Sequence, residues 1–477
     1  MELVQRDAYR WEVPKTGRMA VPGLIFSDDV MIEDILRDRG PVQVANVATL
    51  PGILTHSLAM PDMHWGYGFP IGGVAAFDIK NGVISPGGVG YDINCGVRLI
   101  RTELEHGRIK KKLEELIMEL FRAIPSGVGS KGRLHLNEKD ERSVLTRGAR
   151  WAVERGMGGE EDLVRTEDGG VMEGAEPEAL SERALTRGKD QLGTLGSGNH
   201  FLEIGVVDEV YDDRTARAFG LFTNGVVVQI HSGSRGLGYQ VCDDFLKIMG
   251  RVTAREGIDI PDRQLACAPI GSDEGREYYS AMACAANYAW ANRQVMLHWT
   301  REVFMRVLNL SPVELKMNMV YDVCHNIAKF ERHTIDGKKR EVCVHRKGAT
   351  RSLPPGHPLV PGPYRDVGQP ILIPGDMGTA SYVLVGTENA VAETFASTCH
   401  GAGRVLSRKA AKQKAQGRAI ARELEDQGIL VMAAGKNALA EEIPEAYKDV
   451  DRVVAAVEGA GLSRKVARLK PIGVIKG

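Results

Sequence analysis

Asp92 and Cys95 lie in an unusually glycine-rich stretch, GGVGYDINCG, which covers residues 87–96. Glycine loses more conformational freedom on folding than any other residue, so a local excess indicates a special backbone conformation or the close approach of a bulky group. A carboxylate and a thiolate are also both able to bind a metal ion. We therefore interpret this stretch as part of a ligand site.

Three histidines lie where an expected strand meets a turn. His200 opens HFLEIGVV, His231 follows VVVQI, and His325 follows MVYDVC. A regular element fixes such a side chain while the turn leaves it accessible. Together with Asp92 and Cys95, these histidines would suit zinc, manganese or iron, and two ions sharing the thiolate would suit phosphoryl chemistry. Because the histidines are tens of positions from one another and from the Asp92–Cys95 stretch, separate core roles remain an alternative.

The other histidines fall into two groups. His400 in STCHGAGR and His64 in MPDMHWGYGFP also lie at junctions of this kind. The remainder considered have polar or helical neighbours and no companion ligand, so we expect surface or core roles for them. They are His106, His135, His298, His333 and His357.

The overall composition indicates a globular protein of ordinary polarity. Of the 477 residues, 43% are hydrophobic and 26% charged, and the net charge of -1 means that a polyanion would need a local basic patch. The N-terminal segment lacks the apolar run of a signal peptide, and no run of about 18 apolar residues follows. We therefore expect a cytoplasmic protein without membrane association.

The cysteines form a poor disulfide framework. There are seven, widely spaced and without a CxxC pair, so most should be reduced. Cys242, Cys267 and Cys284 have apolar neighbours and are expected to be small core residues.

Alternating strand-like and helix-like segments predict an α/β or α+β fold, with residues 1–477 forming one large domain. The acidic, glycine-rich segment 157–178 is expected to be a mobile surface loop. Asp336 and Gly337 form a hairpin turn signal within the basic segment 332–351. That hairpin is either a solvated edge protected by its charge or a phosphate contact.

Eight segments follow one another along the chain: PDMHWGYGFPIGG, GGVGYDINCGVR, LGTLGSGNHFLEIG, IHSGSRGLG, DVCHNIA, HRKGATR, PGDMGTASYVL and TCHGAGR. Together they resemble the RtcB family of RNA-splicing ligases. The resemblance implies one α/β domain with mixed sheets around a deep metal-lined cleft. It also implies a GTP- and manganese-dependent ligase that joins an RNA 3′-phosphate or 2′,3′-cyclic phosphate to a 5′-hydroxyl, in tRNA splicing or RNA repair.

The resemblance divides the candidate metal ligands between two manganese ions. One ion would bind Cys95, His200 and His231, and the other would bind Asp92, Cys95 and His325. The thiolate would then bridge the pair.

Two further residues match the family's catalytic positions. His400 matches the nucleophile that attacks GTP and carries GMP as a phosphoramidate, which divides one difficult condensation into easier transfers. Asp62 matches the carboxylate that orients this imidazole. Transfer of GMP to the RNA 3′-phosphate would then give an RNA(3′)pp(5′)G end.

The resemblance also implies a nucleotide pocket around His400. Guanine needs acceptors for its N1 and N2 hydrogens and a donor for O6, which Glu203 or Asp376 and Lys476 would provide. Asp376 departs from the serine typical of the family, and Tyr447 is a candidate for stacking. The implied nucleotide-binding residues are Asn199, His200, Phe201, Leu202, Glu203, His325, Asn326, Pro374, Gly375, Asp376, Met377, Ser381, His400, Gly401, Ala402, Gly403 and Lys476.

The expected partners are RNA ends of this chemistry, including tRNA halves. The family often works with an activating protein, archease, and the sequence leaves open whether this chain depends on it. No RNA-recognition module with exposed aromatic residues is apparent, so we expect end chemistry to set specificity more than base reading. Basic residues beside the motifs are candidates for binding RNA phosphate. They are Arg98, Arg235, Lys347, Arg351 and Arg404.

The same residues allow two other functions. One is a phosphoesterase that uses the metal pair without guanylylation, and the other is a non-catalytic protein that binds RNA ends. A covalent GMP label on His400 would distinguish the ligase from both.

Overall fold

The first large β-sheet combines the N-terminal strands with a later hairpin. The computed structural model describes residues 2–477, apart from the side chain of Lys436. The strands are β1 (Val4–Gln5), β2 (Arg10–Val13), β3 (Gly23–Phe26), β4 (Ser57–His64), β5 (Ile71–Asp78), β12 (Asn326–Ile335) and β13 (Lys338–Lys347). They pair in the order β1-β2-β3-β4-β5-β13-β12, and only β3 and β4 run parallel.

The second large sheet carries most of the candidate ligands. Its strands are β7 (Gly96–Glu105), β8 (Phe201–Val210), β9 (Gly225–Ser232), β11 (Asn318–Cys324), β15 (Pro370–Ile373), β16 (Ser381–Gly386), β18 (Leu430–Ala433) and β19 (Ser463–Lys476). The order is β11-β7-β9-β8-β19-β16-β15, and β18 pairs with β19. Every residue of β9 is buried, which matches its run of β-branched side chains and places it inside the molecule.

One amphipathic helix joins the two sheets. In α17 (Val450–Gly459), Val453 and Val457 lie on one face at helical spacing. This face shares a buried apolar cluster with Leu58 of β4 and Leu384 of β16. The common core makes the chain one mixed α/β domain, as expected.

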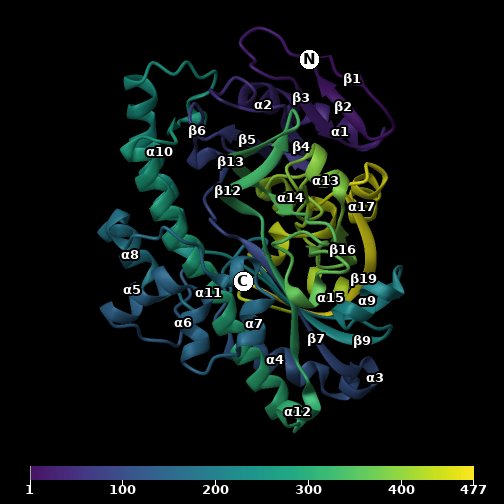
Figure 1. Cartoon of the computed structure of the whole chain (residues 1–477). Coiled ribbons are helices and arrows are strands. Elements are labelled where there is room, and N and C mark those ends of the chain that lie inside the picture. The colour runs from purple at the N-terminus through teal and green to yellow at the C-terminus, as the bar shows by residue number, and fades with distance from the viewer. Residues whose placement is uncertain (1) are drawn as a thin grey trace.

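A layer of helices packs beside the second sheet around a 36-residue helix, α11 (Asp273–Leu308). The Ser272 hydroxyl accepts a hydrogen bond from the Gly275 N–H at 3.1 Å and caps its start, and Asn309 ends it with φ of 52°. Figure 1 shows α11 running beside α10, with shorter helices around them. The layer contains α4 (Leu113–Ala123), α5 (Glu138–Arg147), α6 (Ala149–Glu154), α8 (Glu182–Gly188) and α10 (Arg235–Arg255).

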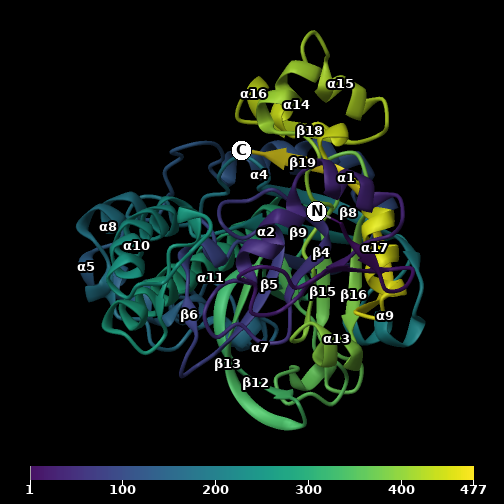
Figure 2. The ribbon, with the colours of Figure 1, turned by 90° about the horizontal axis from the view of Figure 1, so that it is seen from above.

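Short helices near the C-terminal end of the chain form a separate projection. These are α14 (Arg408–Lys414), α15 (Ile420–Glu425) and α16 (Lys436–Glu441). Figure 2 shows them standing out from the body together with β18. We call residues 405–446 the helical lobe. Its Ala411 and Leu424 pack in one apolar cluster with Phe201 and Met377, so the lobe is attached beside the predicted nucleotide residues.

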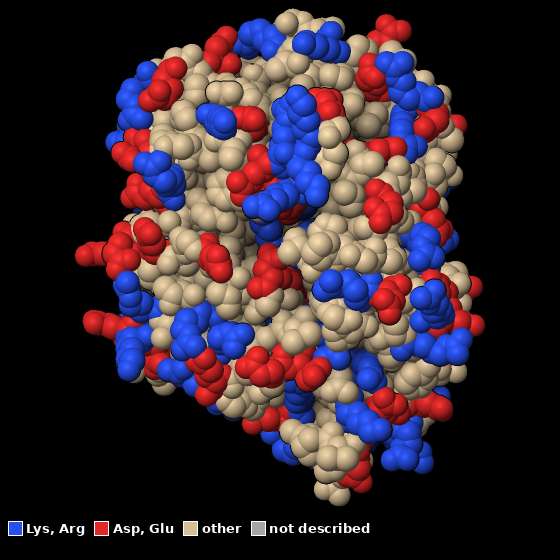
Figure 3. All heavy atoms as spheres, viewed as in Figure 1, with Lys and Arg blue, Asp and Glu red and all other residues tan. Residues whose placement is uncertain are grey.

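Shorter elements complete the described part of the chain. None of the helices in residues 2–477 has an apolar stretch long enough to cross a bilayer. Figure 3 shows positive and negative side chains interspersed over the face viewed, in keeping with the balanced composition. The remaining elements are the helices α1 (Met31–Arg37), α2 (Gly40–Val47), α3 (His106–Ile109), α9 (Asp213–Phe219), α12 (Pro312–Leu315) and α13 (Glu388–Glu393), and the strand pairs β6 (Val83–Ile84) with β10 (Ala268–Pro269) and β14 (Ala349–Arg351) with β17 (Ser397–Cys399).

Segment 157–178 differs from the open surface loop expected. It contains the helix α7 (Glu160–Val164) and short 3₁₀ turns. Asp162 and Glu167 are buried, and they form ion pairs with Arg301 and Lys329. Composition did not reveal this packing because the partners lie more than 100 positions away. Mobility of the segment stays a prediction.

The basic hairpin is formed by β12 and β13, which pair antiparallel around Asp336 and Gly337. Its tip and its base differ in exposure. Lys338 and Lys339 near the turn are exposed, whereas Arg346 at the other end is buried. The hairpin is therefore a solvated tip on a buried base.

Candidate metal and nucleotide site

A cleft of about 620 Å³ lies where the ends of strands from both sheets meet the helical lobe. Most of the predicted site residues line it, although they come from segments spread over nearly 400 positions of the sequence. Those that do are Asp92, Cys95, Asn199, Phe201, Glu203, His231, His325, Asn326, Pro374, Gly375, Asp376, Met377, His400, Gly401, Ala402, Gly403 and Lys476.

Strand register brings four of the candidate ligands to one end of the second sheet. The residue after Cys95 pairs with the residue after His231 on β9 and with the residue before His325 on β11. The residue after His200 pairs with His231 itself. Because β11, β7, β9 and β8 are neighbours in that order, the four side chains start from adjacent backbone positions.

The donor atoms converge. Cys95 Sγ lies 3.4 Å from His200 Nε2 and 3.2 Å from His231 Nε2, and the three ligand atoms lie within 4.8 Å of one another. His231 Nε2 is 3.3 Å from His325 Nε2, and His200 Nε2 is 2.8 Å from Asp92 Oδ2. All five predicted ligands therefore form one contiguous cluster, which we call the ligand cluster.

Burial sets the protonation of the ligand cluster. It lowers the pKa of all three histidines, those of His231 and His325 well below the usual value, so their imidazoles are neutral. Burial, followed by the charge of Asp92, raises the pKa of the Cys95 thiol well above its ordinary value. Asp92 is half-buried; its partial desolvation raises its pKa, but the hydrogen bond with His200 and the charge of Arg235 outweigh this and the carboxyl has a pKa of about 2.

These properties fit a pair of divalent cations. Neutral imidazoles, a carboxylate and a thiol are suitable donors, and a cation beside Cys95 would favour the thiolate that burial disfavours. His231 Nδ1 and His325 Nδ1 are buried without a hydrogen-bond partner, so no protein contact fixes which nitrogen carries the proton. Gly96 allows the close approach of β11, because a Cβ there would lie 2.2 Å from the Val323 carbonyl oxygen.

His400 and Asp62 form a second feature of the cleft. Asp62 is fully buried on β4, and its Oδ2 lies 2.5 Å from His400 Nδ1. The same oxygen accepts from the backbone N–H of His400 at 2.9 Å and of Gly401 at 3.3 Å. With Nδ1 held by Asp62, His400 Nε2 is the nitrogen left free to react. The His400 and His325 rings are 5.0 Å apart between centroids, which places this pair beside the ligand cluster.

A family model described as tRNA-splicing ligase RtcB matches residues 43–477. The chain belongs to the RtcB family. It is 57% identical to the tRNA-splicing ligase RtcB of Thermococcus kodakarensis over 476 residues, which is 100% of this chain and 99% of the relative. It is 56% identical to the tRNA-splicing ligase RtcB of Archaeoglobus fulgidus, over 98% of both chains. The RNA-splicing ligase RtcB of Mycobacterium bovis is 55% identical over 91% of this chain and 100% of its own length.

Three predicted nucleotide residues of this RtcB family member lie behind the cleft surface. The His200 side chain belongs to the ligand cluster. Leu202 is fully buried, because its side chain leaves β8 on the face opposite Phe201 and Glu203. Ser381 accepts a hydrogen bond from the Gly375 N–H at 3.2 Å and so holds the loop that lines the cleft.

The expected guanine-reading groups differ in availability. Glu203 accepts one hydrogen bond, from Gln229 Nε2 at 2.9 Å, and burial raises its pKa to about 8. Asp376 already accepts from the Gly378 N–H at 2.8 Å and from the Thr379 hydroxyl at 2.8 Å, which closes a turn. Glu203 is therefore the less committed acceptor in the RtcB cleft.

Lys476 and Gly403 both line the cleft. Lys476, near the end of β19, is 3% exposed and its ammonium donates to the Gly198 carbonyl at 3.3 Å. Gly403 has φ of 74°, and a Cβ there would lie 2.1 Å from the Asp62 carbonyl oxygen. A side chain at this position would therefore displace the backbone of Asp62.

Three of the five candidate RNA-binding residues are buried, which corrects that expectation. Arg98 pairs with Asp322 at 2.8 Å, and Arg351 pairs with Asp168 at 2.9 Å. Lys347 donates to three backbone carbonyls, including those of residues 69 and 87 at 3.1 and 3.0 Å. Their charges serve packing inside the protein. Arg404 lines the cleft, and half-buried Arg235 contacts His200 Nδ1 at 3.3 Å.

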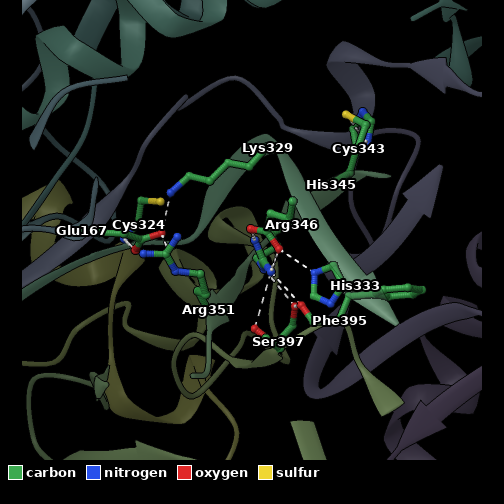
Figure 4. Close-up of polar contacts among 12 residues, drawn as sticks. Glu167, Cys324, Lys329, His333, Cys343, His345, Arg346, Arg351, Phe395 and Ser397 are labelled. Atoms are coloured by element: carbon green, nitrogen blue, oxygen red, sulfur yellow. Dashed lines mark hydrogen bonds and ion pairs between the residues drawn. The ribbon is translucent and has the colours of Figure 1, made fainter. Parts of the chain in front are cut away.

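Figure 4 shows the buried polar contacts around Arg351. Arg346 also lies there; it donates to Glu331 and, at 2.8 Å, to the Ser397 hydroxyl. Ser397 starts β17, the strand that leads to His400. We call the ion pairs among Glu167, Asp168, Lys329, Glu331, Arg346 and Arg351 the charge network.

Several residues that line or support the cleft were not predicted. Trp65 lines it and lies within the segment PDMHWGYGFPIGG, so its type could have suggested a ligand contact. Buried Lys448 lies outside the lining; it donates to the carbonyls of Pro61 and Met63 at 2.8 and 2.7 Å and so holds both sides of Asp62, but no sequence pattern signals such a contact. Other lining residues outside the prediction are Asp38, Ile71, Gly348, Val405, Leu406, Ser407, Arg408, Glu442 and Val474.

Proposed function

We propose that this chain is an RNA ligase that uses GTP and manganese to join an RNA 3′-phosphate or 2′,3′-cyclic phosphate to a 5′-hydroxyl. Family membership supports the ligase activity. The observation that carries the detailed proposal is the 2.5 Å contact between His400 Nδ1 and Asp62, in the same cleft as the ligand cluster. An oriented imidazole beside a cation site is the arrangement that nucleotidyl transfer needs.

In the first step, His400 Nε2 attacks the α-phosphorus of GTP. A phosphorus–nitrogen bond forms, the bond to the β-phosphate oxygen breaks, and pyrophosphate leaves. The proton stays on His400 Nδ1, where it is hydrogen-bonded to the Asp62 carboxylate. The negative charge of Asp62 stabilises the positive charge that develops on the ring. The product is GMP bound covalently to His400.

The second step moves GMP to the RNA. An oxygen of the 3′-phosphate attacks the GMP phosphorus, the bond to His400 breaks, and the end becomes RNA(3′)pp(5′)G. The 5′-hydroxyl of the other strand then attacks the RNA phosphorus and GMP leaves. A 2′,3′-cyclic phosphate is first opened by water.

We propose that one ion takes Cys95, His200 and His231 and that the other takes Asp92, Cys95 and His325. When bound, the ions would neutralise charge on the phosphate oxygens. The chain itself positions the reactants: Glu203 would accept from the guanine edge and Lys476 would donate to O6. Dependence on archease and action on tRNA halves remain predictions of the resemblance.

The test uses the whole chain with manganese and α-labelled GTP. We expect a covalent label on the wild type that His400→Ala abolishes, and ligation of RNA strands with 3′-phosphate and 5′-hydroxyl ends. Phosphatase activity without any label would favour the phosphoesterase, and binding of RNA ends without either reaction would favour the binding protein.

A further inference from the structure

Trp65 is exposed within the cleft. This residue directly follows the last residue of β4, and it lines the cleft. It retains 45% of its accessible surface. Tryptophan is highly buried on average, so an indole face left open in a concave site indicates a surface that a ligand covers. The proposed steps on His400 give Trp65 no task.

The loop that carries Trp65 is held in place by its backbone. Asp38 accepts a hydrogen bond from the Trp65 N–H. The fully buried Gln43 accepts from the Gly66 N–H at 2.9 Å and donates to the carbonyls of Gly66 and Gly68 at 2.7 and 3.0 Å. The backbone at the indole is therefore fixed in the conformation that exposes it.

Further aromatic rings continue from the same loop. Tyr67 packs edge-on against Tyr91 at 5.6 Å between centroids, and Tyr91 stacks on Tyr239 at 4.7 Å. The Arg187 guanidinium lies 4.9 Å from the centre of the Tyr239 ring, which is 47% exposed. We call Trp65, Tyr67, Tyr91 and Tyr239 the aromatic band. Tyr91 directly precedes Asp92, so the band adjoins the ligand cluster.

We propose that the aromatic band stacks the unpaired bases of an RNA strand whose end enters the cleft, with the terminal base on Trp65. This inference rests on the proposed function and names how its substrate is held. Every base has a π face, so stacking is tolerant of sequence, and a ligase that accepts different RNA ends needs such tolerance. Arg187 extends the band with a planar cation that suits both bases and phosphate.

The competing occupant of Trp65 is the guanine of GTP. The groups suited to the guanine edge, Glu203 and Lys476, lie on β8 and β19 of the second sheet. Trp65 lies in the loop between β4 and β5 of the first sheet. The two groups of residues therefore come from different sheets, which favours RNA as the ligand of Trp65.

The experiment measures binding of fluorescent single-stranded RNA to the full-length chain by anisotropy, with manganese and without GTP. Base stacking contributes enough that Trp65→Ala should weaken binding by roughly 5- to 150-fold, and Trp65→Phe should restore most of it. Phe330→Ala is the matched control, since Phe330 is an exposed aromatic on the β12 hairpin outside the cleft lining. Equal affinity of Trp65→Ala and the wild type would overturn the proposal.

RNA lacking one base identifies the stacked nucleotide. In the wild type, an abasic terminal nucleotide should weaken binding, and in Trp65→Ala the same change should cost nothing further. Separate strands with a 3′-phosphate and with a 5′-hydroxyl show which end Trp65 holds. Equal penalties for the abasic RNA in both proteins, on both strands, would exclude stacking on Trp65.

Labelling of His400 separates this inference from the proposed function. If the wild type takes no GMP label but its RNA affinity depends on Trp65, the ligase mechanism fails and the stacking surface stands. If Trp65→Ala instead raises the GTP concentration needed for half-maximal labelling while RNA affinity is unchanged, Trp65 holds guanine and the inference is wrong.

Tyr239→Ala should weaken binding only of strands several nucleotides long.

Discussion

Two buried polar regions lie side by side in this molecule, and they are balanced differently. In the charge network, each charged group faces an opposite charge. The Lys329 ammonium lies 2.5 Å from both Glu167 and Asp168, Arg351 lies 2.9 Å from Asp168, and Arg346 pairs with Glu331. Figure 4 labels Glu167, Lys329, Arg346 and Arg351 of this network. Its electrostatic needs are met within the protein.

The ligand cluster is equally buried but lacks this balance. It gathers a thiol and three neutral imidazoles around a single carboxylate, and two of the imidazoles leave a nitrogen without a partner. Burial alone therefore does not distinguish a structural region from a reactive one. The difference lies in whether the protein itself supplies the opposite charge and the missing hydrogen bonds.

The largest effect should come from Cys95→Ala, which removes the sulfur from the centre of the ligand cluster. We expect ligation to fall by at least about 10³-fold, since bound cations contribute several kcal/mol to stabilising phosphoryl charge. Without metal, the melting temperature should change little, because no ion pair is lost. The rise in melting temperature on adding manganese should vanish.

Cys284→Ala is the control for that experiment. Cys284 is another buried thiol, on α11 and outside the ligand cluster, so its variant should keep the response to manganese. An undiminished manganese response in Cys95→Ala would contradict the ligand assignment.

Arg346→Met tests the charge network from the opposite direction. The change leaves the buried Glu331 carboxylate without its guanidinium, which should lower the free energy of unfolding by about 3–5 kcal/mol. Chemical denaturation of the metal-free chain measures it. Lys339→Met, at the exposed tip of the same hairpin, should change the value by less than about 0.5 kcal/mol. Equal stability of the two variants would show that buried Glu331 does not need the charge of Arg346.

Asp62→Asn keeps the size of the side chain and removes its charge. The rate of GMP labelling should fall by about 10²-fold, because the imidazole loses the group that fixes its proton on Nδ1. Single-turnover labelling with excess GTP gives this rate. Asp78→Asn on β5, where the carboxylate holds a turn, should leave it within a factor of two or so. A full rate in Asp62→Asn would show that His400 needs no orienting carboxylate.

The smallest effect is the pH dependence of stability that Glu203 contributes. Burial raises the pKa of this carboxyl from 4.5 to about 8. Between these values the folded chain holds a proton that the unfolded chain has released, so stability falls as pH rises from about 4.5 to 8. One such proton contributes a slope of up to about 1.4 kcal/mol per pH unit. Urea unfolding across this range should show Glu203→Gln losing that slope, and exposed Glu173→Gln retaining it.

The candidate ligands could be predicted from the sequence because each lies next to a β-rich run, and such runs are recognised from neighbouring residues alone. Asp92, Cys95 and the three histidines follow or precede β-rich runs, and strand pairing then brings them together. Cys242, Cys267 and Cys284 are free and buried, as their apolar neighbours indicated. The hairpin turn at Asp336 and Gly337 is likewise a local signal.

The burial of these charged residues could not be predicted in the same way. Arg98, Lys347 and Arg351 lie beside functional motifs, yet each is buried by partners distant in the sequence. For Lys347 and Lys448 those partners are backbone carbonyls, which every residue possesses and which leave no trace in composition. The residues of the aromatic band are visible in the sequence, but their proximity is not, because the rings come from three separate segments.

The placement of β19 bears on how the protein is made. This strand lies between β8 and β16 inside the second sheet, yet it follows every other strand of that sheet in the sequence. Until the ribosome has synthesised it, the neighbouring strands have edges that can pair with other chains. Assembly of the sheet must therefore wait for residues 463–476, and a growing polypeptide would depend on protection from aggregation.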